Sequence, residues 1–552
     1  MALSLSPAAR GNLTDLLICF SVGNLWFLRR WYDLEHLKER AMDYYRSAPA
    51  DPALMIATLA GAFLFTAVLY LAWMWVKLRP SPGKLKLAQS SFLLLLIYPL
   101  ESVRTYWNIE NGRPDLGTNI ALLAIEGVLA IGLVLLWMGN RRVLHAARRV
   151  ALMLTLLFPA LMVDFGWGAL AAEPASAYLP KPSATMLPPH AGPGRRVVWL
   201  LFDELDQRLA FDLHLPEVSL PELDRLRAES LVATHAVQTA GWTMLALPSL
   251  ISGVIYSSDQ LIDANTLRVH PNGSEQALNW ADQPNVFKRA RAGGLNAALV
   301  GWHHPYCRVI GESLVRCMDV HSHPTTAMLR EIRADDQGAL RATAMLFRVQ
   351  FANLVDILRM REGEDASSER SFDEYAQSRQ QKQYFQIRDR AYADIADPQL
   401  DLLFVHFPAP HPFGIYDRRR RDFALNDSLD YFDNLALVDR TVGEVRAVLE
   451  KSELWDSTSL IITSDHGFRP DMWRDRLGWT PRLQQLTAAG QSPLVPVIVK
   501  LAGKDRGAVY DSPISNVVCG DLALAILSGD VSTPSDAISW LDRAANPEKS
   551  VR

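Results

Sequence analysis

The side chains best suited to metal chemistry follow two apolar runs of strand length. Asp203 and Glu204 come directly after VVWLLF, and Asp465 and His466 come directly after SLIITS. In an open α/β sheet, ligands bind at the carboxyl ends of strands, which is where these side chains are expected. A single acid after a strand is usually a turn or a helix cap. An acid and a histidine adjacent on one tight turn offer two metal ligands, so we predict a metal role for Asp465 and His466.

Another candidate for chemistry is Thr243, in the stretch THAVQTAGWTMLALPSLISG. It stands where a loop gives way to an apolar helical run. A hydroxyl at a helix N-terminus is usually an N-cap. The same position suits a nucleophile that attacks phosphate, because a helix N-terminus favours anions and a bound metal lowers the pKa of a hydroxyl. The residues alone leave both interpretations open.

The pattern around these residues predicts an α/β domain. The runs VVWLLF, LNAALVGW, LLFVHF, SLIITS and LVPVIVK have strand length, and amphipathic helical stretches lie between them, clearest at 428–452. Buried strands that alternate with helices indicate a largely parallel sheet flanked by helices. The polar stretch 361–383 predicts a surface excursion or an exposed helix, to which we assign no chemistry.

The composition excludes some classes of protein. The chain has 552 residues with a formal net charge of −4, so no excess of either sign points to nucleic acid as a partner. Its four cysteines are too few for a disulfide scaffold. Cys307 and Cys317 lie close together and form either a disulfide, if this region is outside the cytoplasm, or two unpaired thiols. Zinc binding by this pair is disfavoured, since no second Cys/His pair lies nearby at finger spacing.

Nearly all the long apolar runs lie before residue 172. They extend from Leu13 to Leu28, Pro52 to Val76, Leu87 to Val103, Thr118 to Met138 and Val150 to Leu170. A spanning helix needs about 20 apolar residues. The second, fourth and fifth runs reach this length, whereas the first and third are shorter and contain polar residues. We predict a bundle of about five transmembrane helices over 1–170, a Pro/Ala-rich linker over 171–195 and an extracytoplasmic catalytic domain over 196–552.

Loop charge predicts the orientation of this bundle. The loops after the second and fourth runs are basic and contain no acid: Lys77, Arg79, Lys84, Lys86, Arg141, Arg142, Arg148 and Arg149. Positive loops face the cytoplasm. We therefore expect a multi-pass protein of a bacterial-type plasma membrane, with a cytoplasmic N-terminus and everything after Leu170 in the periplasm or outside the cell. The segment from Trp31 to Tyr45 could form a helix that lies on the membrane surface.

Four motifs carry a family resemblance. VVWLLFDE, GWTMLALPSLISG, HFPAPHPF and IITSDHG, in that order, resemble the alkaline phosphatase/sulfatase superfamily over roughly residues 195 to 500. With its apolar N-terminal part, the chain is similar to the membrane-anchored branch, which includes lipid A phosphoethanolamine transferases and lipoteichoic acid synthases. The resemblance implies an alkaline phosphatase-like domain.

The resemblance also implies a role for each matching residue. Asp203 falls on the first metal-ligand acid, and Glu204 on the second acid of the sulfatase pair, as a ligand or the neighbour of one. Thr243 falls on the nucleophile, which also binds the metal. Asp465 and His466 fall on the metal pair of the later strand.

The histidines of HFPAPHPF divide into two interpretations. His411 falls on a substrate-contacting histidine that protonates a leaving group or orients the phosphate. Its alternative is a loop histidine stacked on the proline or phenylalanine that follows. His406 lies inside the predicted strand and is interpreted as structural.

The chain departs from the sulfatase pattern at the nucleophile. Sulfatases need a cysteine or serine there, with a proline and an arginine after it, whereas Thr243 is followed by Met-Leu-Ala-Leu. Sulfate ester hydrolysis is therefore disfavoured, and threonine is what the phosphotransferase branch uses. No histidine follows His466, which disfavours a second metal site. One divalent metal with oxygen and nitrogen ligands remains, and that ligand set suits Zn²⁺ or Mn²⁺.

Together these features predict a phosphotransferase. It would move a phospholipid head group, of phosphoethanolamine or phosphoglycerol type, to a glycan or lipid acceptor through a phospho-threonine intermediate. Its predicted partners are the phospholipid donor, that acceptor and the bilayer. Water as the acceptor would make a phosphodiesterase or phosphatase. Two alternatives stay open: a sulfatase-like enzyme of soluble esters, and a non-catalytic membrane lipid sensor or scaffold that keeps the fold.

Overall fold

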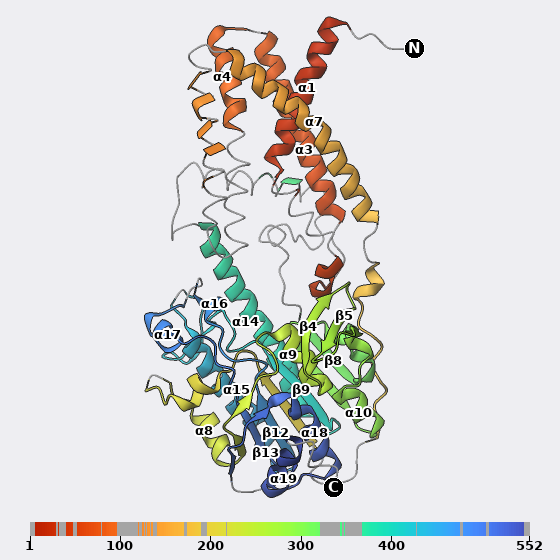
Figure 1. Cartoon of the computed structure of the whole chain (residues 1–552), viewed down its shortest axis with the longest axis vertical. Helices are drawn as coiled ribbons and strands as arrows, with labels where there is room; N and C mark the ends of the chain where they lie inside the picture. The colour runs from red at the N-terminus through yellow and green to blue at the C-terminus, as the bar shows by residue number, and fades with distance from the viewer. Residues whose placement is uncertain are drawn as a thin grey trace. The chain divides into compact units, whose positions relative to one another are not determined.

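A computed structural model divides the chain into two compact units (Figure 1). The first contains Met1–Arg40, Pro49–Glu173 and Pro324–Ser367, and the second contains Ala41–Ala48, Pro174–His323 and Ser368–Arg552. The structure describes residues 6–28, 31, 40–47, 52–78, 80–95, 141–170, 174–188, 196–216, 218–320, 367–426, 428–474, 478–503 and 507–545, with a few positions between 120 and 135 and between 343 and 347.

This division differs from the contiguous one that the composition suggested. The predicted linker is not a free tether over residues 174–188: Lys181 donates a backbone hydrogen bond to the carbonyl of Cys307 (3.0 Å), and Ala184 donates one to Leu314 (2.8 Å). Residues 41–48, expected within the membrane part, belong to the second unit. Backbone and side-chain hydrogen bonds, which composition cannot predict, assign both segments to that unit.

The first unit is helical. Its described helices are α1 (Pro7–Trp26), α3 (Pro52–Leu78), α4 (Pro82–Leu94) and α7 (Arg141–Leu170). Two stretches of the described residues, Ile56–Leu78 and Arg142–Asp164, are long and apolar enough to cross a membrane. The first stretch overlaps the second predicted run. The second stretch overlaps the fifth run over residues 150–164, and it also contains Arg142, Arg148 and Arg149, which were predicted to lie in a loop but are part of the helix α7. The third run is described only as far as residue 95, and only a few positions of the fourth run are described, so the bundle of about five helices stays a prediction.

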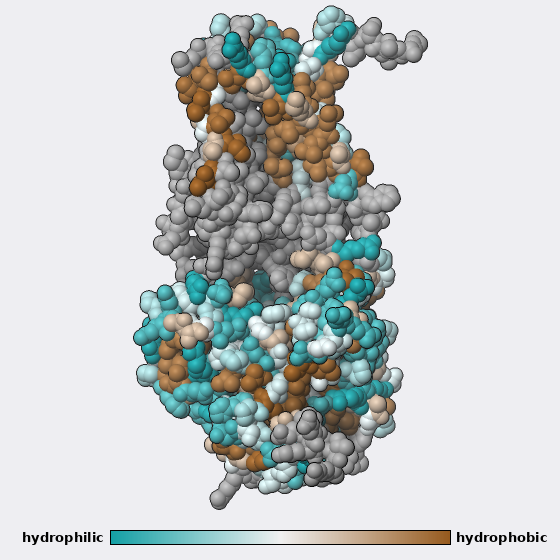
Figure 2. All heavy atoms as spheres, viewed as in Figure 1, coloured by the Kyte–Doolittle hydropathy of each residue, from teal (hydrophilic) through white to brown (hydrophobic). Residues whose placement is uncertain are grey.

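The outward faces of α3 and α7 are apolar. Leu78 and Leu156 are 75% and 80% exposed, and Figure 2 shows hydrophobic residues gathered over these helices. Soluble proteins rarely expose so large an apolar surface. The carboxylate of Asp15 joins three helices, since it pairs with Lys77 (2.9 Å) and Arg148 (3.2 Å).

The second unit is built on an eight-stranded sheet in the order β14-β2-β13-β12-β1-β9-β7-β8. The strands are β1 (Arg196–Phe202), β2 (Leu231–Ala233), β7 (Ala297–Trp302), β8 (Arg316–Val320), β9 (Leu402–Phe407), β12 (Thr458–Thr463), β13 (Val497–Lys500) and β14 (Ala508–Tyr510). β1 pairs in parallel with β9 and β12, while β13 runs antiparallel to β12 and β2. The predicted α/β domain with a largely parallel sheet is confirmed. Its central strands are largely apolar because both faces of the sheet are covered, whereas the edge strand β8 contains Arg316 and Asp319 and is half-buried.

Alternate residues of β1 supply two separate cores. Val197, Trp199 and Leu201 pack on one side with α9 (Thr243–Ser252), α10 (Val286–Ala292), α18 (Cys519–Ser528) and α19 (Pro534–Ala545). Val198, Leu200 and Phe202 pack on the other side with α8 (Pro221–Ala228), α14 (Ser367–Ile395) and α15 (Tyr431–Lys451). This alternation follows from the two-residue period of a strand, and it makes the sheet the middle layer of a three-layer unit.

Short elements complete the second unit. They are η1 (Arg40–Tyr45), η2 (Ala175–Tyr178), η3 (Arg208–Asp212), β3 (Ala236–Val237), β4 (Tyr256–Leu261), β5 (Leu267–Pro271), β6 (Leu278–Asn279), η4 (Trp280–Asp282), α11 (Tyr306–Val309), η5 (Gly311–Ser313), β10 (Tyr416–Asp417), β11 (Asp422–Phe423), α16 (Pro470–Trp473), α17 (Pro481–Leu486), β15 (Ile514–Ser515) and η6 (Asn516–Val518). A disulfide joins Cys307 in α11 to Cys317 in β8. Of the two states left open for these cysteines, the structure has the bonded one.

Candidate active site

The site lies where β1 and β12 end side by side. Their parallel register pairs Leu201 with Thr463, so the residues that follow each strand meet at one edge of the sheet. The hydroxyl of Ser464 joins the two strand ends, because it donates to the carbonyl of Phe202 (2.8 Å) and accepts from the N–H of Leu205 (2.8 Å). Asp203, Asp465 and His466 are thereby brought together, as the strand-end rule predicts.

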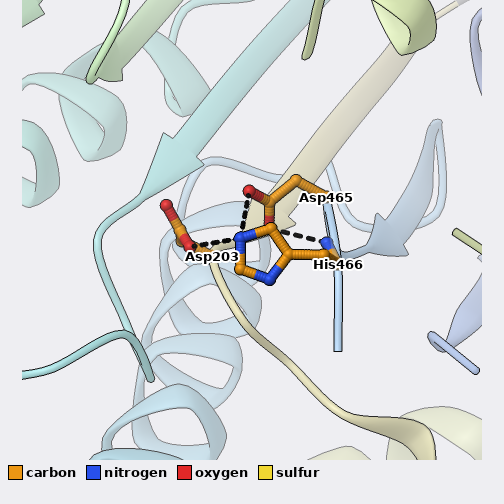
Figure 3. Close-up of side chains that lie close together, drawn as sticks. All are labelled: Asp203, Asp465 and His466. Atoms are coloured by element: carbon orange, nitrogen blue, oxygen red, sulfur yellow. Dashed lines mark hydrogen bonds and ion pairs between the residues drawn. The ribbon is translucent and has the colours of Figure 1, made fainter. Parts of the chain in front are cut away.

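Three fully buried side chains form the centre of the site (Figure 3). Nε2 of His466 lies 3.2 Å from Oδ2 of Asp465 and 3.7 Å from Oδ1 of Asp203. The Thr243 hydroxyl, which is 3% exposed, completes the group. Its Oγ1 lies 3.2 Å from Nε2 of His466 and 3.4 Å from Oδ2 of Asp203.

These four side chains fit a single divalent cation. Oδ1 of Asp203 and Oδ2 of Asp465 are buried and have no hydrogen-bond partner among the described residues. Buried polar atoms are rarely left in that state, and a cation would satisfy both. Tetrahedral ligands about 2.0 to 2.1 Å from a metal stand about 3.3 Å from one another. Nε2 of His466 lies 3.2 Å from both Asp465 Oδ2 and Thr243 Oγ1 and 3.7 Å from Asp203 Oδ1, and these separations are close to that value.

The pKa values of Asp203 and Asp465 are shifted in opposite directions. Burial and the neighbouring charge of Asp465 raise the pKa of Asp203 to about 8. Burial acts on Asp465 in the same direction, but the adjacent His466 and the hydrogen bonds that Asp465 accepts outweigh it and hold the pKa of Asp465 below its usual value. Two buried carboxylates that share one site cannot both ionise cheaply. A divalent cation removes this conflict, because both can then carry their charge.

The main chain at Thr243 leaves its hydroxyl available for chemistry. Trp242, in an extended conformation, is the N-cap of α9, and Thr243 is the first helical residue. The N-cap interpretation of this hydroxyl is therefore wrong, because the side chain points at Asp203 and His466 and not at the helix backbone. The helix N-terminus places positive partial charge beside the hydroxyl, which favours a phosphate there.

Glu204 does not join the group. Its backbone has a φ of 70°, a left-handed conformation. The Glu204 side chain therefore points in a different direction from that of Asp203. Its carboxylate accepts hydrogen bonds from the N–H of Arg469 and from the indole of Trp473. Burial raises the pKa of Glu204 to about 8. As the structure places it, Glu204 supports the loop after β12 and is not one of the grouped ligands.

His411 lies beside the group without being part of it. Its N–H donates to the carbonyl of Asp203 (3.1 Å), and its ring Nδ1 lies 2.7 Å from the carbonyl of Pro412. A carbonyl only accepts, so Nδ1 carries the proton and Nε2 is left as an acceptor. Gln380 of α14 donates to the His411 carbonyl (2.6 Å) and so helps to hold this loop. The substrate contact of His411 stays a prediction.

His406 touches the centre, although the sequence suggested a structural histidine. Its Nε2 lies 3.4 Å from Oδ2 of Asp203 and accepts from the indole of Trp302 (3.0 Å). The hydroxyl of Tyr306 lies 3.1 Å from Nδ1. An indole only donates, so Nδ1 carries the proton and donates to that hydroxyl. Burial lowers the pKa of His406 to about 4 and keeps the ring neutral.

Sequence reasoning missed His304. It follows β7, whose carboxyl end lies at the same edge of the sheet as that of β9. Its Nε2 lies 3.4 Å from the carbonyl of Thr243, and its Nδ1 lies 2.9 Å from the hydroxyl of Tyr44. The run LNAALVGW was recognised as a strand, so the strand-end rule that found Asp203 would have found His304 too. No comparable pattern points to Tyr44.

The fold and this site define the class of the protein. A buried acid–acid–histidine group with a threonine hydroxyl, at the carboxyl edge of a largely parallel sheet, fits an enzyme that acts on phosphoric esters. The model of the type I phosphodiesterase / nucleotide pyrophosphatase family matches residues 197–486, from β1 to α17. The chain belongs to that family. No curated protein matches it in sequence.

Solved structures of low sequence identity resemble the chain. A protein in the alkaline phosphatase superfamily from Vibrio parahaemolyticus is 14% identical, with a TM-score of 0.35 over 66% of this chain and 75% of that one. The phosphonate monoester hydrolase of Agrobacterium radiobacter is 15% identical, with a TM-score of 0.35 over 61% of this chain and 77% of that one. A sulfatase from Pseudoalteromonas sp. is 16% identical, with a TM-score of 0.38 over 60% and 67%.

Proposed function

We propose that the chain is a metal-dependent phosphotransferase that moves a phospholipid head group to an envelope acceptor through a phospho-threonine intermediate. The observation that carries this proposal is the place of the Thr243 hydroxyl, within 3.4 Å of both Asp203 and His466. A hydroxyl so placed is a nucleophile and a metal ligand at once. A divalent cation, Zn²⁺ or Mn²⁺ by ligand type, would lower its pKa and offset charge on the phosphate.

The chemistry is two in-line displacements at phosphorus. In the first, the Thr243 oxygen bonds to phosphorus and loses its proton, while the bond to the diacylglycerol oxygen breaks and that oxygen takes up a proton. In the second, the acceptor hydroxyl bonds to phosphorus and loses its proton, while the bond to Thr243 breaks and the Thr243 oxygen takes up a proton. Asp203 orients the threonine hydroxyl through their contact of 3.4 Å. Nε2 of His411, left as an acceptor, is proposed to meet the substrate.

A lipid donor is supported by the first unit. Two stretches of its described helices are long and apolar enough to cross a membrane, and a bilayer holds phospholipid within reach of an anchored enzyme. Phosphoethanolamine or phosphoglycerol as the head group, and a glycan or lipid as the acceptor, belong to this proposal, as do the plasma-membrane location and the resemblance to the membrane-anchored branch.

A second candidate function is hydrolysis of a phosphodiester. The family to which the chain belongs is described as type I phosphodiesterase / nucleotide pyrophosphatase, which specifically favours it. The same two displacements apply, with water in place of the acceptor hydroxyl. For one and the same donor, the two functions therefore differ in what accepts the phosphorylated group from Thr243.

The test uses the full chain in phospholipid vesicles with labelled phosphatidylethanolamine or phosphatidylglycerol. Diacylglycerol release and the mass of the peptide that contains Thr243 are measured. We expect release from one of the two lipids and a mass increase equal to its phosphorylated head group. Thr243→Ala should remove both signals. Thr234→Ala is the matched control, because the Thr234 hydroxyl bonds Asp511 at the β14 edge of the sheet.

Two outcomes separate the candidates. Full diacylglycerol release by Thr243→Ala would refute the threonine mechanism for both. Rapid release of the phosphorylated head group in water, without added acceptor, together with cleavage of a nucleoside pyrophosphate, would favour the hydrolase. Slow release in water that an added glycan or lipid hydroxyl accelerates would favour the transferase.

A further inference from the structure

A short segment from between the first two predicted spans is built into the second unit. η1 (Arg40–Tyr45) includes Tyr44, which is fully buried in the core on the α9 side of the sheet. Arg308 of α11, itself 3% exposed, holds the segment by donating to the carbonyls of Asp43 (2.9 Å), Tyr44 and Arg46. A buried guanidinium with several carbonyl partners fixes a backbone firmly, since each lost bond would leave a buried donor unsatisfied.

The segment reaches the nucleophile through one histidine. The hydroxyl of Tyr44 lies 2.9 Å from Nδ1 of His304, and Nε2 of His304 lies 3.4 Å from the carbonyl of Thr243. The carbonyl can only accept, so Nε2 carries the ring proton and Nδ1 accepts. The Tyr44 hydroxyl must then be the donor. One directional chain therefore runs from Tyr44 through His304 to the backbone of Thr243.

His304 has little freedom apart from this chain. The rings of Tyr44, Trp280 and Tyr306 lie 5.9, 5.2 and 5.6 Å from its ring, centroid to centroid. Aromatic packing fixes where the imidazole lies, but it does not decide which nitrogen carries the proton. The Tyr44 hydroxyl decides that, because a donor at Nδ1 excludes a proton there. Packing alone would be served equally well by phenylalanine.

We propose that Tyr44 is a positioning residue for the nucleophile. It fixes the tautomer of His304, and His304 in turn fixes the first turn of α9 so that the Thr243 hydroxyl faces Asp203 and His466. The segment of residues 41–46 thus helps to position the nucleophile, although it lies about 200 residues before the nucleophile in the chain. This inference rests on the proposed nucleophilic role of Thr243.

The test is Tyr44→Phe in the full chain, assayed with bis(4-nitrophenyl) phosphate as the phosphodiester probe. The variant keeps the ring and removes the hydroxyl. We expect kcat to fall about tenfold with KM changed by less than about twofold, since the loss of one buried hydrogen bond misplaces the nucleophile without touching the substrate. Tyr384→Phe is the matched control, because Tyr384 is also buried and its hydroxyl bonds Thr441, outside the site. It should keep the wild-type kcat.

A double-mutant cycle tests the route. Because Tyr44 acts through His304, Tyr44→Phe should cause no further loss of kcat in a His304→Leu background. If Tyr44→Phe fails to fold, two His304 variants test the same link. Glutamine can accept from Tyr44 and donate to the Thr243 carbonyl, so His304→Gln should recover most of the activity that His304→Leu loses.

The possible failures are distinct. A wild-type kcat for folded Tyr44→Phe, or independent losses in the cycle, would overturn the positioning role while Thr243→Ala remained inactive. Equal losses in His304→Gln and His304→Leu would overturn it as well. Full turnover by Thr243→Ala would instead overturn the proposed function, and the role of Tyr44 with it.

Discussion

Replacing Asp465 with asparagine separates the two tasks of its carboxylate. Oδ1 accepts from the N–H groups of His466 (2.9 Å) and Glu204 (3.1 Å), so it shapes the turn after β12. Oδ2 has no hydrogen-bond partner among the described residues and faces Nε2 of His466. An asparagine that keeps its oxygen at the Oδ1 position preserves the turn. It removes one charge and one metal ligand.

The size of the effect follows from binding linkage. A metal present at 100 times its Kd stabilises the folded state by about 2.7 kcal/mol. At about 2 °C per kcal/mol for a unit of this size, wild-type protein should gain about 5 °C in Tm. Loss of a ligand should weaken binding at least about 100-fold, as even the loss of a supporting residue can. The same metal concentration then equals the Kd, and the gain falls to about 0.4 kcal/mol, less than about 1 °C.

Without metal, the wild type should no longer be more stable than Asp465→Asn. Wild-type protein then buries the carboxylates of both Asp203 and Asp465 in one site, whereas Asp465→Asn keeps only that of Asp203. Relief of that conflict should make the metal-free variant at least as stable as metal-free wild type. Without metal, Asp465→Asn should therefore have a Tm equal to or above that of the wild type. With metal, the wild type should have the higher Tm.

The assay is thermal unfolding of chelator-treated protein, with Zn²⁺ and Mn²⁺ each added back. Asp439→Asn is the matched control, because Asp439 is also a buried acid but accepts the N–H of Leu223 in α8. It should keep the full metal-induced gain. A gain of about 5 °C in Asp465→Asn, equal to that of the wild type, would refute the placement of the metal.

Three other substitutions test the surroundings of the site. Cys307→Ser opens a disulfide that closes a short loop and should lower the free energy of unfolding by about 2 to 3 kcal/mol, as measured by denaturant unfolding without reductant. Gly467→Ala would place its Cβ in collision with the carbonyl of Ser492, so we expect a loss of about 2 kcal/mol or more and a lower kcat; a neutral result would contradict the tight turn beside His466. Arg308→Leu should release the segment of Tyr44, with hydrogen exchange faster at residues 40–46 by mass spectrometry and stability lower by about 3 kcal/mol; unchanged exchange would contradict the anchor.

The central ligands could be predicted because their positions depend on local rules. A short apolar run predicts a buried strand, parallel strands end at one edge, and Asp203, Asp465 and His466 each follow such a run. Five of the eight strands of the sheet were found, each within three residues of its ends, as for the run 197–202 against β1 (Arg196–Phe202), whereas β2, β8 and β14 were not. The direction of β13 could not be predicted, since strand pairing depends on the path of the whole chain.

Glu204 shows where a local rule stops. It is as close to the strand end as Asp203, yet its left-handed backbone conformation directs the carboxylate to Arg469 and Trp473. One residue beyond a strand, the turn determines the direction of a side chain, and sequence spacing cannot show that turn. The polar stretch 361–383 is a similar case. It looked like a surface element, but Gln380 is buried and bonds the His411 loop.

The contact of Tyr44 with His304 could not be predicted from local sequence patterns, because it joins distant parts of the chain. The Tyr44 hydroxyl meets His304 across 260 residues of sequence, and nothing in the pattern around either residue points to the other. The second unit is therefore assembled from chain segments on both sides of α3 and α7. A truncated protein that begins after α7 would therefore lack not only the helices but also Tyr44, whose hydroxyl donates to His304. If Tyr44 orients Thr243 as proposed, activity depends on the N-terminal region through a residue that reaches the nucleophile, and not only through attachment to a membrane.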